Sequence, residues 1–242
     1  MQSFSDYALR DEGALRWESP DDIRIAYSID AGTANPEIAP TIDEYFSKVL
    51  PTLSDVIGRR VAATADSAKA DILVLIVGDP IGAYSRFQPS IDRVLLGRVN
   101  LGAIVATAHG ECLAYARAQN DEGDTQFLPD IGVRHETADG LRAPDHLRLT
   151  AGILIASVLK GSDSLKSCMS HSLPRLLGVS GAAILPSMRL AYSGHETPTE
   201  VDPFDLELLR GLYRTDGLHS GDTWYKAMAL YKQFLLRNSQ QQ

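Results

Sequence analysis

The stretch "ADILVLIVGD", residues 70–79, decides the fold class of this chain. Its unbroken run of large, mostly β-branched apolar residues is typical of a strand that is covered on both faces. Upstream, "IRIAYSI" at 23–29 alternates apolar and polar or small residues, which predicts a second strand. Between them, apolar residues recur at helical spacing over 42–57, with Pro51 at a kink or at a break between two helices. The first third of the chain is therefore predicted to be β-α-β.

Downstream of the central strand, the pattern changes from strand to helix. We expect a short helix within 87–100, followed by strands and turns over 102–119 and 128–140. From residue 143 onward we expect mostly helices. An apolar stripe predicts the first of them, which Gly161 would end: Leu147, Leu149, Ile153, Leu154, Val158 and Leu159.

Three further helices are expected after Gly161. Ser162 or Asp163 would cap a helix that carries Leu165, Met169 and Leu173 and that ends at Gly178. Two more helices are predicted within 202–214 and 220–237, where large apolar residues recur every three or four positions. The predicted class is α+β, with a mixed sheet and helices first and a mostly helical part after it.

Composition excludes several classes of partner. The chain has 242 residues, of which 44% are hydrophobic and 22% charged, as in ordinary globular proteins. Its net charge of −8 disfavours nucleic acid and anionic membrane surfaces. No run of eighteen apolar residues occurs, so we expect no membrane span. The first residues lack a basic-then-apolar signal, which fits a cytoplasmic protein if Met1 is the native start, or a mature exported form without its leader.

The stretch "LKSCMSHSLPRLLGVSG", residues 165–181, has the spacing of the zinc-hydrolase motif H-E-x-x-H-x-x-G-x-x-H. His171 stands at the first position, but Ser172 replaces the Glu base, Arg175 the second His and Gly181 the third. An arginine has no lone pair for a metal and its charge opposes a cation, while a serine hydroxyl is too weak a base. Only Gly178 keeps its role, a sharp left-handed exit from the helix. A core helix with a single His is the plainer interpretation.

Two other sets of residues carry possible chemistry. His195 and Glu196 lie in a polar, turn-rich segment and could bind a cation with the nearby Asp202, or form an altered site with His171. Cys112 and Cys168 do not form a C-x-x-C pair, which excludes a four-sulfur zinc site. The number of cysteines alone does not distinguish a structural disulfide from two separate buried thiols.

The chain resembles the bacterial domain-of-unknown-function family 2927, exported proteins that look like distant relatives of metzincin-type zincins. Three stretches carry the resemblance: "CMSHSLPRLLGVSG" at 168–181, "ILPSMRLAYSG" at 184–194 and "VDPFDLELLRGLYRTDGLHSGDTWYKAM" at 201–228. The family's Glu-Glu and Gln are absent here. The matching residues are Cys168, His171, Ser172, Arg175, Gly178, Val179, Pro186, Ser187, Met188, Asp205, Leu208, Leu209, Leu212, Tyr213 and Gly221.

The resemblance implies a zincin-like fold, a Cys112–Cys168 disulfide and an oxidising compartment, periplasmic or secreted. It also implies an N-lobe of about 17–160, a C-lobe of about 161–236 and a cleft between them, in one domain over 1–236. The polar residues 237–242 are expected to form a disordered tail.

Three functions remain open from the sequence. The first is a non-catalytic zincin-like domain that binds a protein or peptide and needs no cofactor. The second is a divergent metal-dependent peptidase with an altered zinc site around His171. The third is a structural subunit whose helical residues, among them Trp224 and Tyr225, cover a partner. The oligomeric state cannot be predicted.

Overall fold

The computed structural model describes residues 14–30, 33, 35–78, 80–95, 112–120, 125–129, 147–158, 161–179 and 199–239. Its six strands are β1 (Ile23–Ile29), β2 (Val61–Ala63), β3 (Ile72–Val77), β4 (Cys112–Gln119), β5 (Thr125–Pro129) and β6 (Arg148–Ser157). Its helices are α2 (Ile38–Ile57), the short 3₁₀ helix η1 (Ser67–Lys69), α3 (Pro80–Leu95), α5 (Ser162–Leu176), α7 (Pro203–Arg214) and α8 (Trp224–Ser239). The chain is therefore of mixed helix and sheet, as predicted.

The six strands form one mixed sheet in the order β2-β1-β3-β6-β4-β5. β1, β2, β3 and β6 run parallel, whereas β4 is antiparallel to both of its neighbours, β6 and β5. The predicted β-α-β unit over 23–77 is confirmed, with β3 in the interior of the sheet and completely buried.

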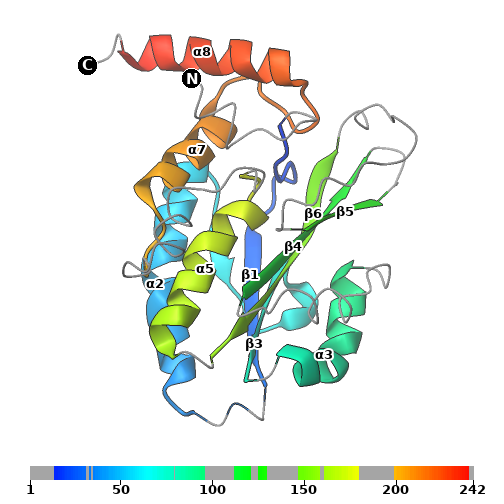
Figure 1. The fold of residues 1–242 in the computed structure, drawn as a ribbon. Helices are drawn as coiled ribbons and strands as arrows, with labels where there is room; N and C mark the ends of the chain where they lie inside the picture. Colours follow the sequence, from blue (N-terminus) through cyan, green and yellow to red (C-terminus); the bar gives the residue numbers. More distant parts are fainter. Residues whose placement is uncertain are drawn as a thin grey trace.

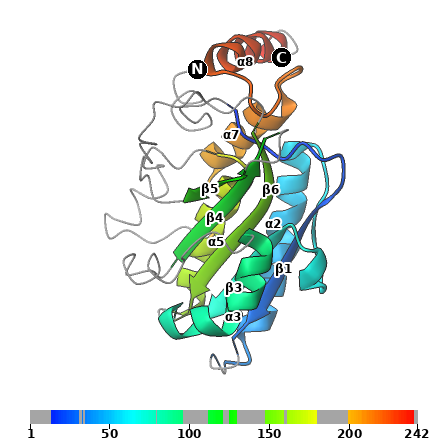
Figure 2. The ribbon, with the colours of Figure 1, turned by 90° about the vertical axis from the view of Figure 1, so that its right-hand side faces the viewer.

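Helices cover both faces of the sheet (Figures 1 and 2). α2, α5 and α7 lie on one face and α3 lies on the other. A hydrophobic core lies on each face of the sheet, and alternate residues of β3 belong to one or the other. Ile72, Val74 and Ile76 belong to the larger core with α2, α5 and α7. Leu73, Leu75 and Val77 pack in the smaller core with Ile91 of α3. This division is the period-two alternation of a strand buried on both sides.

One of our predictions was wrong in the type of element. Residues 148–157 form a strand, β6, and the predicted helix with a stripe from Leu147 to Leu159 does not occur. β6 lies between β3 and β4 and is buried from Ala151 to Ser157, so both of its faces are apolar. A short run that is apolar on all sides has no period that separates strand from helix, which explains the error.

Smaller corrections concern helix ends. α2 continues through Pro51, which lies on its exposed side, so there is no break into two helices. Gly161, rather than Ser162 or Asp163, occupies the N-cap position of α5, with φ of 94°. α3 begins at Pro80, well before the predicted 87. α8 extends through Ser239, so residues 237–239, placed in the expected tail, are helical.

The strand assignment of β6 makes a direct prediction. Ile155 lies outside the predicted helical stripe but is only 3% exposed in β6. Ile155→Ala should therefore lower the free energy of unfolding by about 2–5 kcal/mol, as much as Leu154→Ala, because both remove buried methyl groups. Urea denaturation of the two variants measures this. A cost for Ile155→Ala below about 0.5 kcal/mol would contradict the strand.

Candidate functional site

The motif helix α5 is the most enclosed helix of the described chain. Every residue from 167 to 179 is buried. α5 packs on β4 and β6 of the sheet, and it also contacts α2 and α7. The polar residues of the motif therefore lie inside the molecule, where each needs a hydrogen-bond partner or an opposite charge.

A disulfide joins Cys168 of α5 to Cys112 at the start of β4, with 5.5 Å between the two Cα atoms. The pairing that the family resemblance implied is confirmed. Ser172, at the position of the Glu base, lies one turn further along α5, and its Oγ is 3.3 Å from the Sγ of Cys112. A serine that is 1% exposed beside a disulfide cannot act as the base of a hydrolase.

His171 is held by its own helix. Its Nδ1 lies 2.6 Å from the backbone oxygen of Ser167, and this oxygen can only accept, so Nδ1 carries the proton. Nε2 is buried and has no hydrogen-bond partner. A His whose Nδ1 donates to a carbonyl is oriented as metal-binding His residues are, with the lone pair of Nε2 free to bind. Among the described residues, however, no group of three His, Cys, Asp or Glu side chains could hold a metal ion.

Arg175, at the position of the second His, is 4% exposed. Its positive charge acts on Asp205, the third residue of α7, which is completely buried and whose two carboxylate oxygens accept no hydrogen bond. Burial raises the pKa of Asp205 to about 7; the charge of Asp202 adds to this rise and that of Arg175 opposes it. The charge of a buried arginine on α5 thus acts on a buried carboxyl group of α7.

The exit of α5 is as predicted from Gly178. This residue has φ of 114°, and a Cβ there would lie 2.1 Å from the carbonyl oxygen of Leu15. Only glycine fits both the backbone conformation and the close approach of the chain.

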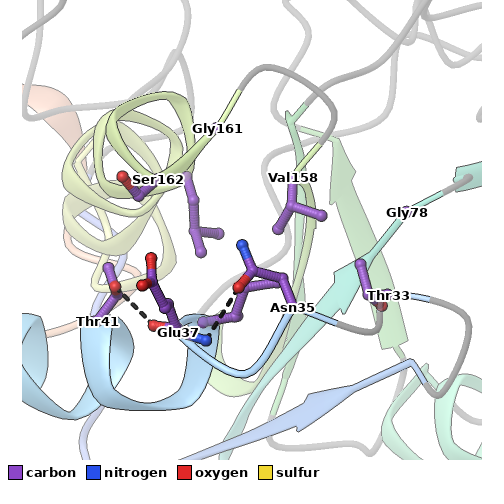
Figure 3. Close-up of a pocket in the computed structure, with 10 residues that line it drawn as sticks. Thr33, Asn35, Glu37, Thr41, Gly78, Val158, Gly161 and Ser162 are labelled. Carbon is purple, nitrogen blue, oxygen red and sulfur yellow. Dashed lines mark hydrogen bonds between the residues drawn. The ribbon is translucent and has the colours of Figure 1, made fainter.

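The described part of the chain also contains a cavity of about 520 Å³ at the carboxyl ends of the parallel strands. Thr33 follows β1, Gly78 follows β3 and Val158 follows β6, while the starts of α2 and α5 close the other side (Figure 3). Open parallel sheets commonly bind ligands at this edge. The sequence analysis missed this cavity, because β6 was taken for a helix.

Two features shape the rim of this cavity. Arg86 of α3 donates from Nε to Oδ1 of Asp30 at 2.9 Å, and the Asp30 carbonyl accepts from the backbone N–H of Thr33 at 2.8 Å. Asn35 accepts from the backbone N–H of Glu37 at 3.0 Å, and the Glu37 side chain is exposed at the start of α2. The walls thus combine hydroxyl, amide and carboxylate groups with apolar side chains such as Ile38 and Leu165.

Several predicted site residues lie outside the described residues. These are Gly181, His195 and Glu196, together with Pro186, Ser187 and Met188 of the family resemblance. Of the predicted motif positions, the structure places His171, Ser172, Arg175 and Gly178 on α5 or at its end. The residue that sequence reasoning did not assign to the site is Asp205, which the family resemblance includes only as part of the closing helical segment.

Comparisons with protein-family models, with curated proteins and with solved structures found no match. In the described part of the chain, none of the helices has the length and apolar character that crossing a membrane requires.

The close approach at Gly178 predicts a large effect of a single methyl group. Gly178→Ala should lower the free energy of unfolding by roughly 3–5 kcal/mol, because the strained backbone and the clash with the Leu15 carbonyl both add. Gly161→Ala is the matched control: Gly161 also has positive φ, but no atom lies within 4 Å of its Cβ position. Its cost should be roughly 1–3 kcal/mol, measured by thermal unfolding. Equal costs would show that the close approach is absent.

The disulfide predicts a second stability effect. Replacing both cysteines by Ser should lower the free energy of unfolding by about 3–4 kcal/mol, because the cross-link shortens a long loop of the unfolded chain. Denaturant titration of the wild type and of the Cys112→Ser/Cys168→Ser variant measures the difference. A thiol assay that finds two free thiols in the unreduced wild-type protein would contradict the pairing.

Proposed function

We propose that this chain is a non-catalytic, zincin-like domain of an exported bacterial protein, related to the domain-of-unknown-function family 2927, and that it binds a protein or peptide. Two features of the structure support the relationship. A mixed sheet with an antiparallel strand leads through β6 directly into the motif helix α5. The disulfide lies where the family resemblance puts it, and such a bond fits an oxidising compartment.

The observation that carries the non-catalytic role is the burial of Arg175 at the position of the second metal ligand. A guanidinium keeps its proton at any accessible pH, so it neither binds a metal nor leaves room for a second cation beside it. Asp205 is the carboxyl group on which its charge acts. The buried arginine thus supplies the positive charge that a zinc ion supplies in an active hydrolase.

The cavity at the strand ends is our candidate for the binding surface. It offers hydroxyl, amide and backbone groups from Thr33, Asn35 and Ser162 together with apolar walls, a mixture that suits a peptide better than a purely apolar ligand. It opens between the starts of α2 and α5, away from the buried motif face of α5.

Metal analysis tests the non-catalytic role. Protein incubated with zinc and then dialysed should retain less than roughly a tenth of an equivalent of the metal, in the wild type and in His171→Ala alike, because Arg175 blocks the second ligand position. Elemental mass spectrometry gives the stoichiometry. One zinc per chain that is lost in His171→Ala would overturn the proposal.

The binding surface has its own test. Thr41 lines the cavity, so Thr41→Trp should fill it without changing the core, whereas Lys48→Trp alters an exposed position further along the same helix. Cross-linking in the native compartment should recover a partner with the wild type and with Lys48→Trp, and roughly tenfold less with Thr41→Trp, a loss of about 1.4 kcal/mol. Equal recovery with all three proteins would contradict this surface.

A divergent peptidase is the second candidate, favoured by one observation. His171 directs a buried Nε2 without a hydrogen-bond partner away from the Ser167 carbonyl, as a metal-binding His would. Turnover of peptide substrates that is lost in His171→Ala would support this candidate over the first.

A structural subunit is the third candidate. The exposed large hydrophobic residues of the described chain, Tyr225, Leu235 and Leu236, all lie on α8, at one end of the molecule (Figure 1). Sedimentation that shows a stable oligomer, lost in Tyr225→Ser/Leu236→Ser, would support this candidate.

A further inference from the structure

Asp205 is a carboxyl group in a place that does not suit a charge. It is the third residue of α7, it is 0% exposed, and both of its oxygens lack a hydrogen-bond donor. An ionised carboxylate in such a place loses its hydration without replacement, so the protonated form is favoured. The residue is not the N-cap of α7, which is Asp202, and it lies outside the zinc-hydrolase motif at 171–181.

The charges that act on Asp205 come from two elements. α5 contributes the buried Arg175, which attracts the carboxylate, and the start of α7 contributes Asp202, which repels it. α2 also packs on α7, but among the described residues no charged group of α2 is found to act on Asp205. The attraction by Arg175 therefore favours the ionised form of Asp205, whereas the repulsion by Asp202 and complete burial disfavour it.

We propose that the first turn of α7 is a pH-sensitive latch, closed while Asp205 is protonated and released when Asp205 ionises. Opening would be confined to this turn, because Leu208, Leu209 and Leu212 anchor the rest of α7 at 3%, 0% and 0% exposure. The amides that report on the turn are those of Phe204 and Leu206, which donate to Asp202 Oδ1 and to the Asp202 carbonyl. The latch goes beyond the proposed binding role and does not depend on it.

The direction in which opening depends on pH follows from the pKa of Asp205 in the closed and open forms of the turn. When the turn is closed the pKa of Asp205 is about 7, and when it is open the carboxyl is hydrated and returns to the ordinary pKa of 3.8. The closed form therefore binds the proton more tightly, so acid favours it. The opening equilibrium should rise with pH between about 4 and about 7 and become constant above that range.

Hydrogen exchange with residue resolution, on the full chain with its disulfide intact, tests the latch. After correction for the intrinsic pH dependence of exchange, the opening equilibrium at Phe204 and Leu206 should rise roughly tenfold or more between pH 5 and pH 7.5. Asp205→Asn has the same shape but does not titrate, so it should abolish the rise. Glu207→Gln removes an exposed carboxylate of the same helix and should leave the rise unchanged.

A third variant tests the part played by Arg175. Arg175→Met removes the attraction, so Asp205 of the closed turn should ionise at a higher pH, and the rise should continue to a higher pH before it levels off. A wild-type profile without a rise, or an equal rise in Asp205→Asn, would overturn the latch. A rise in Arg175→Met that levels off at the same pH as in the wild type would show that Arg175 has no part in the latch. If Arg175→Met does not fold, the comparison of Asp205→Asn with Glu207→Gln still shows whether Asp205 is the group that controls opening of the turn.

Discussion

The burial of α5 between the sheet and α7 is the constraint on which the rest of this structure depends. The helix is joined to β4 by the Cys112–Cys168 disulfide and to α2 by a 2.9 Å hydrogen bond between the hydroxyls of Ser170 and Tyr45. At its C-terminal end, the Leu176 carbonyl accepts from Nε1 of Trp17 at 2.8 Å. Carbonyl groups at a helix end need such partners when they are buried. The enclosed position of α5 thus orders the sheet, α2 and the N-terminal segment around it.

The same enclosure decides what the motif residues can do. In a hydrolase the helix with the H-E-x-x-H spacing must leave room for a metal, a water molecule and a substrate. Here the polar atoms of His171, Ser172 and Arg175 face backbone, disulfide and a buried carboxyl group. An open concave surface exists elsewhere, at the carboxyl ends of β1, β3 and β6.

The sequence predicted the elements that have a clear period and missed those that do not. The alternation in β1 and the helical spacing in α2 and α7 identify their type because each of these elements has one polar face. β6 was taken for a helix because it has no polar face between Ala151 and Ser157. Residue type alone was enough to exclude a normal zinc motif, because Arg175 cannot bind a metal. It was also enough to predict that the chain leaves the helix at Gly178. Asp205 and the cavity could not be predicted, since both arise from contacts between segments far apart in the sequence.

The central claim is that α5 is a closed structural helix with a built-in cation, and the most direct measurement is a long-range ¹H–¹⁵N NMR spectrum of the His171 ring during a zinc titration. The account predicts a proton on Nδ1, donated to the Ser167 carbonyl, and ring resonances that do not change with zinc. A shift of Nε2 that saturates at one equivalent of zinc would contradict it, because the motif face would then be an open metal site.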